Sequence, residues 1–200
     1  MIAESWEKII EWGNRNAPEM LTDLNPGASE EQIAVLEVEL GQSIPADFRE
    51  SLLIHNGESD GWPCKVFADY GAYLGTEGIL ENWKQRKQIA AEIENYMDEM
   101  PDPEQQIRDG IITVEGPVRP KLFLKDWIPI MDSNGDVFWA LDMNPAEDGI
   151  PGQVIAVDLE GCSWMVVADS FGSFIRDYAQ ALKDGAYRVV DGQPTKEEEE

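Results

Sequence analysis

The sequence is poor in the residues that bind zinc or form disulfides. Its 200 residues include two cysteines, Cys64 and Cys162, and a single histidine, His55. Zinc sites in proteins draw on clusters of cysteine and histidine, and no such cluster is present here. We therefore expect no metal and no cofactor. A chain of this length buries about 70% of its unfolded surface and needs no cross-link to fold.

Basic residues are also scarce, with 15 lysines and arginines against 40 aspartates and glutamates, which gives a formal net charge of −25. Nucleic acids and anionic membrane surfaces repel such a chain, so neither is an expected partner. The charge is compatible with a basic protein partner, and equally with high solubility alone.

Long apolar runs are missing. The first residues, MIAESWEKIIEW, carry acidic side chains where a signal peptide has basic ones, and they contain no apolar segment. No stretch approaches the length of a membrane span. We expect a cytoplasmic protein with reduced cysteines.

Catalytic patterns are lacking as well. His55 precedes Asn56-Gly57 at the end of an expected helix, where the helix dipole favours a histidine. A histidine base needs a nucleophile beside it, and no serine or cysteine motif supplies one. The segment 71–75 is rich in glycine but lacks the Gly-Lys-Ser/Thr ending of a phosphate loop. The sequence therefore indicates a protein that is not an enzyme.

Helical spacing and capping residues predict helices over much of the first half and at the end. Ser29 with Gln32 forms a capping-box pattern, and Gly41 is suited to ending that helix. The cluster Lys84, Arg86 and Lys87 is expected on an exposed helix face, paired with Glu81 and nearby acidic residues. The expected helices run from Ser5 to about Trp12, from Ser29 to Gly41, from Pro45 to Asn56, from Thr76 to about Met97, and onward from Ser170.

From Trp127 the pattern changes to that of strands joined by short turns, which favour antiparallel neighbours. The expected strands are Trp127–Met131, Val137–Asp142, Val154–Asp158 and Trp164–Ala168, with a further short strand at Ile111–Val114. This order predicts a single α+β domain with a mostly antiparallel sheet of about four to six strands flanked by helices. We expect an N-terminal helix and linker packed on the domain over residues 1–27, the domain itself over 28–188, and an acidic, disordered tail over 189–200.

The segment Asp132-Ser133-Asn134-Gly135-Asp136 begins like a calcium-binding EF-hand loop. Such a loop needs glycine at its sixth position and glutamate at its twelfth, where this chain has Val137 and Met143. Asn134-Gly135 is instead typical of a type I′ turn between two strands. We interpret the segment as a hairpin turn rather than a metal site.

Aromatic and acidic side chains near these loops are the candidate partner-binding residues. Tyrosine and tryptophan are common interface anchors, although core packing is the alternative for each ring. Trp139 follows Phe138 in one strand, so the two rings point to opposite faces, and we expect one of them to be exposed. The candidates are Trp62, Tyr70, Tyr73, Asp132, Asp136, Trp139 and Asp142.

The order of several sequence blocks resembles the SMI/KNR domain of the SUKH superfamily over about residues 28–185. The most specific features are the pattern LGQSIPADF over Leu40–Phe48, the following Asn56-Gly57, and WIPI from Trp127 with the aspartate–glycine turn after it. Three further blocks also occur in the order that is typical of this domain, namely GTEGILENWK, GQVIAVDLEG and VVADSFGSFIRDYAQAL. The resemblance implies a sheet flanked by helices and a role in binding rather than catalysis.

The same resemblance implies two kinds of function. Bacterial members are similar to immunity proteins that neutralise toxins, often nucleases, and fungal members regulate cell-wall assembly. The acidic charge favours immunity first, because a basic toxin would be steered to an acidic inhibitor and occluded by it. A regulatory or scaffold protein of wall synthesis or signalling is the alternative, and a carboxylate-dependent hydrolase is a third. We take a monomer as the starting expectation.

Overall fold

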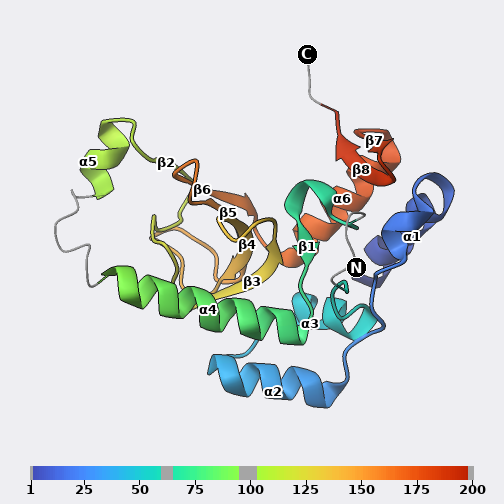
Figure 1. The fold of residues 1–200 in the computed structure, drawn as a ribbon, viewed down its shortest axis with the longest axis horizontal. Helices are drawn as coiled ribbons and strands as arrows, with labels where there is room; N and C mark the ends of the chain where they lie inside the picture. Colours follow the sequence, from blue (N-terminus) through green and yellow to red (C-terminus); the bar gives the residue numbers. More distant parts are fainter. Residues whose placement is uncertain (1, 60–64, 95–102, 198–200) are drawn as a thin grey trace.

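A computed structural model describes residues 2–59, 65–94 and 103–197 (Figure 1). Its α-helices are α1 (Ile2–Asn16), α2 (Glu30–Leu40), α3 (Ala46–Ile54), α4 (Thr76–Glu94), α5 (Pro103–Arg108) and α6 (Phe171–Asp184), with short 3-10 helices η1 (Pro18–Leu21) and η2 (Ala68–Tyr70). The strands are β1 (Ala72–Tyr73), β2 (Thr113–Glu115), β3 (Trp127–Asp132), β4 (Val137–Asp142), β5 (Gln153–Asp158), β6 (Ser163–Ala168), β7 (Tyr187–Val190) and β8 (Gln193–Lys196).

Six strands form one sheet in the order β1-β3-β4-β5-β6-β2. Strands β3 to β6 are consecutive in the chain and pair antiparallel, as their short connections predict. At one edge β1 adds two residues antiparallel to β3, and at the other β2 adds three residues parallel to β6. The predicted α+β fold with a mostly antiparallel sheet is confirmed.

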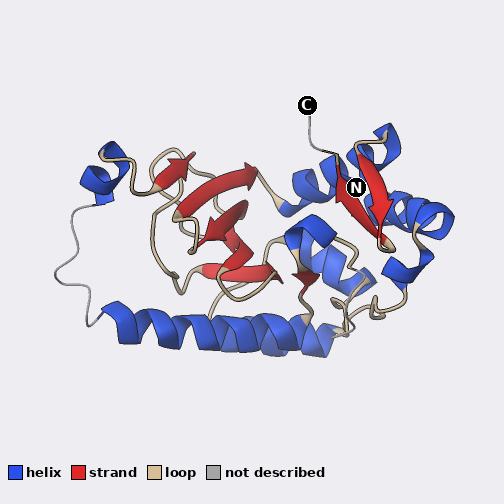
Figure 2. Ribbon diagram, turned by 45° about the horizontal axis from the view of Figure 1, so that its top comes forward, coloured by secondary structure: helices blue, strands red, loops and turns tan. Residues whose placement is uncertain are grey.

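Helices pack against this sheet, and Figure 2 shows the long helix α4 running beside its strands. Phe138 and Trp139 point to opposite faces because side chains alternate along a strand. On one face α4 places Arg86 3.6 Å from the centre of the Phe138 ring. On the other face the ring centroids of Trp139 and Tyr70, from η2, lie 5.5 Å apart. Both rings are buried, so the expectation that one is exposed is wrong.

The capping residues act as their spacing predicts. The Ser29 side chain accepts from the Gln32 amide, and the Gln32 side chain accepts from the Ser29 amide. Gly41 ends α2 in the left-handed conformation, with φ of 69°. Ser170 begins α6 through the same reciprocal pairing with Ser173. These local signals fix where α2 and α6 begin.

The N-terminal segment contributes directly to the core. Helix α1 is longer than the expected 5–12 and contacts α6 and α3. The buried Trp6 indole donates to Ser51 Oγ at 2.9 Å, and that hydroxyl lies 2.9 Å from the hydroxyl of buried Tyr73. This chain of bonds joins α1, α3 and β1.

The residues after 189 differ from the expected disordered tail. Strands β7 and β8 pair from Tyr187↔Lys196 to Val190↔Gln193. The buried Tyr187 ring lies 5.3 Å from that of Tyr178 in α6, and the Lys196 amide donates to Asp69. Contacts with distant residues therefore order a polar segment whose composition alone predicts disorder. Residues 198–200 lie outside the described part of the chain.

Candidate functional site

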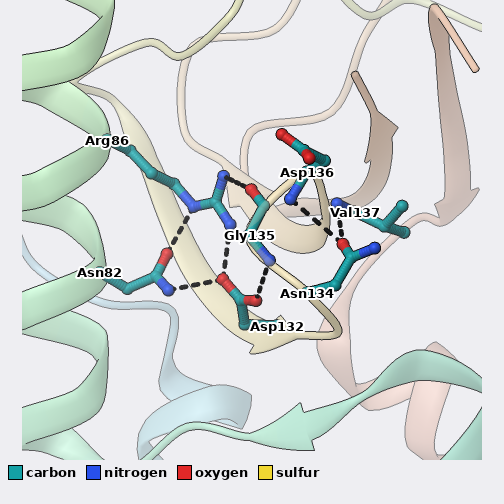
Figure 3. A network of polar contacts seen from close by, with 7 residues as sticks. All are labelled: Asn82, Arg86, Asp132, Asn134, Gly135, Asp136 and Val137. Carbon is teal, nitrogen blue, oxygen red and sulfur yellow. Dashed lines mark hydrogen bonds and ion pairs between the residues drawn. The ribbon is translucent and has the colours of Figure 1, made fainter. Parts of the chain in front are cut away.

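A polar network joins α4 to the β3–β4 hairpin (Figure 3). Arg86 donates to Asp132 Oδ2 at 2.5 Å, to the Gly135 carbonyl at 2.8 Å and to Asn82 Oδ1 at 2.5 Å. Asn82 donates in turn to Asp132 Oδ2. The network holds the hairpin against the middle of α4.

Arg86 is buried, which differs from the exposed basic face expected for Lys84, Arg86 and Lys87. Burial lowers the pKa of the Arg86 guanidinium, and the charge of Asp132 opposes that effect. Its neighbours do not pair with Glu81: Lys84 bonds Glu39 of α2, and Lys87 lies over the ring of Trp83. The sequence spacing predicts that these basic residues lie on a helix. It does not predict which of them is buried, because that depends on how the helix packs against the sheet.

The hairpin loop confirms the predicted turn between two strands but not its type. Gly135 has a positive φ of 87°, whereas Asn134 does not, so the loop is not a type I′ turn. Instead Asn134 Oδ1 accepts from the amides of Asp136 and Val137, and Asp132 Oδ1 accepts from the Gly135 amide. Side-chain acceptors thus replace the expected backbone geometry.

Two acidic candidates in this hairpin are placed differently. Asp132 is mostly covered and carries the ion pair with Arg86. Asp136 is exposed at the tip, so it is open to a partner. The third acidic candidate, Asp142, is fully buried at the far end of β4. Burial raises the pKa of Asp142, and the hydrogen bond from the Asn144 amide opposes that effect.

The structure brings Tyr70 and Trp139 together within the core and places Tyr73 close by. Tyr73 is completely buried, and Trp139 nearly so. Tyr70 is half-buried, with its ring 5.1 Å from that of Phe174. These three rings pack α6 against the sheet and do not form an open cleft. Trp62 lies outside the described residues.

His55 has the structural position that its sequence context predicts. It caps the end of α3, and its Nδ1 lies 3.0 Å from the Asn25 carbonyl. Its ring contacts that of Trp6 edge-on at 4.8 Å. The imidazole is therefore held between the loop that contains Asn25 and helix α1.

A groove that the sequence interpretation missed lies between α2 and α4, which Figure 1 shows next to each other. We call it the α2–α4 groove. Its volume is about 300 Å³, and its lining residues are Ser29, Glu31, Gln32, Val35, Leu36, Thr76, Glu77 and Leu80. One signal was available in the sequence: Val35 is apolar but falls off the buried stripe of Ile33, Leu36 and Leu40, and in the structure it lines the groove and is 54% exposed.

Residues 2–59, 65–94 and 103–197 contain no group of three or more histidine, cysteine, aspartate or glutamate side chains placed to hold a metal ion. Among the same residues, no helix combines the length and the apolar character needed to cross a membrane.

Comparison with known proteins gives one matching family and several fungal relatives. The SMI1 / KNR4 family (SUKH-1) matches residues 27–177. The "Glucan synthesis regulatory protein" of Neurospora crassa is 29% identical over 94% of this chain and 40% of its own length. The "Cell wall biosynthesis/cell cycle regulator smi1" of Schizosaccharomyces pombe is 28% identical over 94% of this chain and 37% of its own length.

The "Cell wall assembly regulator SMI1" of Saccharomyces cerevisiae is similar over the same share of the chain, at 20% identity and 41% of its own length. The chain thus spans about two fifths of each of these three fungal regulators. The family match covers three quarters of the chain, including α2, the first half of α6 and strands β3 to β6. The chain therefore belongs to the SMI1/KNR4 family (SUKH-1).

Proposed function

We propose that this chain is a non-catalytic protein-binding domain that regulates cell-wall assembly, and that it acts in the cytoplasm as a monomer. The observation that carries the proposal is the similarity to three fungal regulators over 94% of the chain. Two of them are named for the cell wall and one for glucan synthesis. The alternative of the sequence analysis, a regulator, thereby takes precedence over the immunity protein.

The position of the polar side chains supports binding rather than chemistry. Asp132 is neutralised by Arg86, Asp142 is buried, and His55 is held by packing against Trp6. A hydrolase would need a carboxylate or a base that reaches its substrate. The accessible features are the hairpin tip at Asp136 and the α2–α4 groove, both of which suit contact with another protein.

A chimera tests this proposal because the chain corresponds to only part of its relatives. The matching segment of the Neurospora crassa regulator is replaced with this chain, and the chimera is expressed in a strain that lacks the regulator. We expect cell-wall glucan content and glucan synthesis by isolated membranes to recover. A chimera that is present at normal amounts, with its inserted domain folded, but restores neither would contradict the proposal.

The charge of −25 favours an immunity protein as the second candidate, since an acidic surface suits a basic toxin. Coexpression with a toxin encoded beside the gene for this chain tests it through cell survival. Survival that disappears when exposed loop aspartates such as Asp136 are reversed to lysine would favour immunity. Survival without dependence on these charges would remove the electrostatic argument.

A further inference from the structure

The α2–α4 groove combines an apolar floor with acidic side chains. Leu80 and the half-exposed Val35 supply the apolar contact above the buried Leu36, and Glu31 and Glu77 are exposed on the two helices. Its volume of about 300 Å³ is at the small end of the range for binding sites, which fits one or two side chains rather than a large ligand. The groove therefore suits an amphipathic side chain from another protein.

Thr76 provides a separate indication of a ligand. The residue lines the groove and is 5% exposed, and its hydroxyl oxygen is closed to solvent in the unliganded chain. Its hydroxyl oxygen has no hydrogen-bond partner among the described residues, although the Thr76 amide bonds Asn56 Oδ1. A buried hydroxyl without a partner costs stability, so a ligand group that bonds it would remove that cost.

The carboxylates of the groove are not neutralised within the described ranges. Neighbouring acids have partners, since Glu30 bonds Arg49 and Glu39 bonds Lys84. No ion pair to Glu31 or Glu77 occurs among those residues. With 15 basic residues against 40 acidic ones in the chain, a basic partner would supply charge complementary to this groove.

We propose that the α2–α4 groove binds an arginine side chain within a basic segment of a partner protein. The aliphatic part of the arginine lies on Val35 and Leu80, and the guanidinium donates to Glu31 and Glu77 and, once a side-chain movement uncovers it, to the Thr76 hydroxyl. Arginine suits this arrangement better than lysine because its planar head presents five donors and is more weakly hydrated. The inference deepens the proposed function and rests on the chain being a protein-binding domain.

A titration with a defined probe tests the groove directly. The probe is a short, acetylated and amidated peptide with one arginine flanked by leucines, and the control peptide has citrulline, which is uncharged and of nearly the same shape. Backbone amide NMR spectra of the full chain locate the site. We expect shifts in residues 29–36 and 76–80 with the arginine peptide, and affinity that falls as salt increases. Equal binding of the citrulline peptide, or shifts located elsewhere, would overturn the proposal.

Matched variants separate the groove from the general acidity of the chain. The double substitution Glu31→Gln with Glu77→Gln should lower the affinity for the arginine peptide by at least about tenfold, because hydrogen bonds to charged groups are lost. Glu7→Gln with Glu50→Gln makes the same change of net charge on α1 and α3, and should change affinity by no more than about twofold. Equal losses in the two pairs would contradict a specific site.

Thr76→Val tests the hydroxyl without removing bulk. We expect about two- to tenfold weaker binding, with a melting temperature that is unchanged or higher, because the unliganded hydroxyl has no bond to lose. Unchanged affinity would remove the hydroxyl from the site. Shifts at the groove that grow with protein concentration alone would show that a second copy occupies it, which would overturn a heterologous partner.

The groove and the proposed function can fail independently. A chimera that restores glucan synthesis with or without the Glu31 and Glu77 substitutions would uphold the regulator and reject the groove. Arginine-specific binding in a chimera that does not restore synthesis would uphold the groove and reject the regulator.

Discussion

Arg86 is the residue on which the contact between α4 and the hairpin depends. It is 8% exposed, bonds three acceptors and lies against the Phe138 ring. Its removal would leave Asp132 charged and poorly solvated at the base of the hairpin. Loss of one member of a buried pair is more damaging than loss of both.

We expect Arg86→Met to lower the free energy of unfolding by about 3 kcal/mol. The double variant Arg86→Met with Asp132→Asn should lose less free energy of unfolding than the two single variants together. The difference, which is the coupling energy, should be about 0.5–3 kcal/mol. Urea unfolding of the four proteins measures this cycle. Lys84→Met, which breaks the exposed pair with Glu39, is the control and should cost no more than about 1 kcal/mol. Strict additivity would show that the buried pair is not coupled.

Glu58 is a second residue with a charge in a covered position. Its two carboxylate oxygens accept from the amides of Val66 and Tyr73, at 2.7 and 2.8 Å. Burial raises the pKa of Glu58 above its ordinary value of 4.5, and the two amides oppose that effect. The folded chain therefore binds the Glu58 proton more tightly than the unfolded chain does.

This raised pKa fixes the sign of a pH effect. The stability that the Glu58 proton contributes is complete below pH 4.5 and is lost as the pH rises through the folded pKa. The Glu58→Gln variant should have a free energy of unfolding that is lower by about 1–3 kcal/mol. One of the two backbone amides would then face the NH₂ group of the glutamine and lose its acceptor. The deficit should be larger at acidic than at neutral pH, as measured by urea unfolding across that range. Glu50→Gln, on the exposed side of α3, is the control, and a Glu58→Gln deficit that grows with pH would contradict the sign.

Among the structural elements, the turns after α2 and α3 both contain a glycine with a positive φ. Only the turn after α3 also lies against a second segment of the chain. Gly57 has a φ of 73°, and a Cβ placed there would lie 2.1 Å from the Gly75 nitrogen. Gly41 has a nearly equal φ of 69° with nothing within 4 Å. The two positions share the backbone conformation and differ in the closeness of a second chain segment.

Alanine at each glycine separates these two effects. Gly41→Ala should cost about 1–2 kcal/mol, which is the cost of a left-handed conformation for a residue with a Cβ. Gly57→Ala should cost more than about 4 kcal/mol, because the loop before α4 must move away. Thermal and urea unfolding measure both. Similar costs would mean that the Gly57–Gly75 contact relaxes freely.

Elements specified by nearby residues could be predicted from the sequence, and elements specified by distant ones could not. Ser29 with Gln32, Gly41 and Ser170 are short-range signals, and each marks a helix end in the structure. Strand β1 and the β7–β8 hairpin are short, and they are ordered by contacts with Met131 and Asp132 and with Asp69. Their partners lie tens of residues away, where local pattern carries no information.

The candidate site shows the same division. The hairpin between β3 and β4 was predictable, including the exposed Asp136. The burial of Arg86 and Tyr73 was not, because Arg86 is covered by the β3–β4 hairpin and Tyr73 packs against rings of α1, α3 and α6. The α2–α4 groove arises from the approach of two helices and has no continuous sequence pattern.

For the whole molecule, the imbalance of 40 acidic against 15 basic residues leaves most carboxylates without a cation. Their mutual repulsion opposes the compact state and is screened by salt. We expect added sodium chloride to raise the melting temperature. Glu7→Lys with Glu50→Lys should stabilise the chain at low salt by about 0.5 kcal/mol and reduce that salt dependence. A melting temperature that falls with salt would show that attractive pairs outweigh repulsion.

The sheet ends at both edges in very short strands, β1 with two residues and β2 with three, although its central strands have six. A longer open edge would offer unpaired amides and carbonyls to any extended peptide, including a second copy undergoing aggregation. The short edges leave little room for a partner to add a strand. Partners of this chain are therefore expected to be recognised through side chains on its helices and hairpin tip, and the chain should resist fibre formation under conditions that partly unfold it.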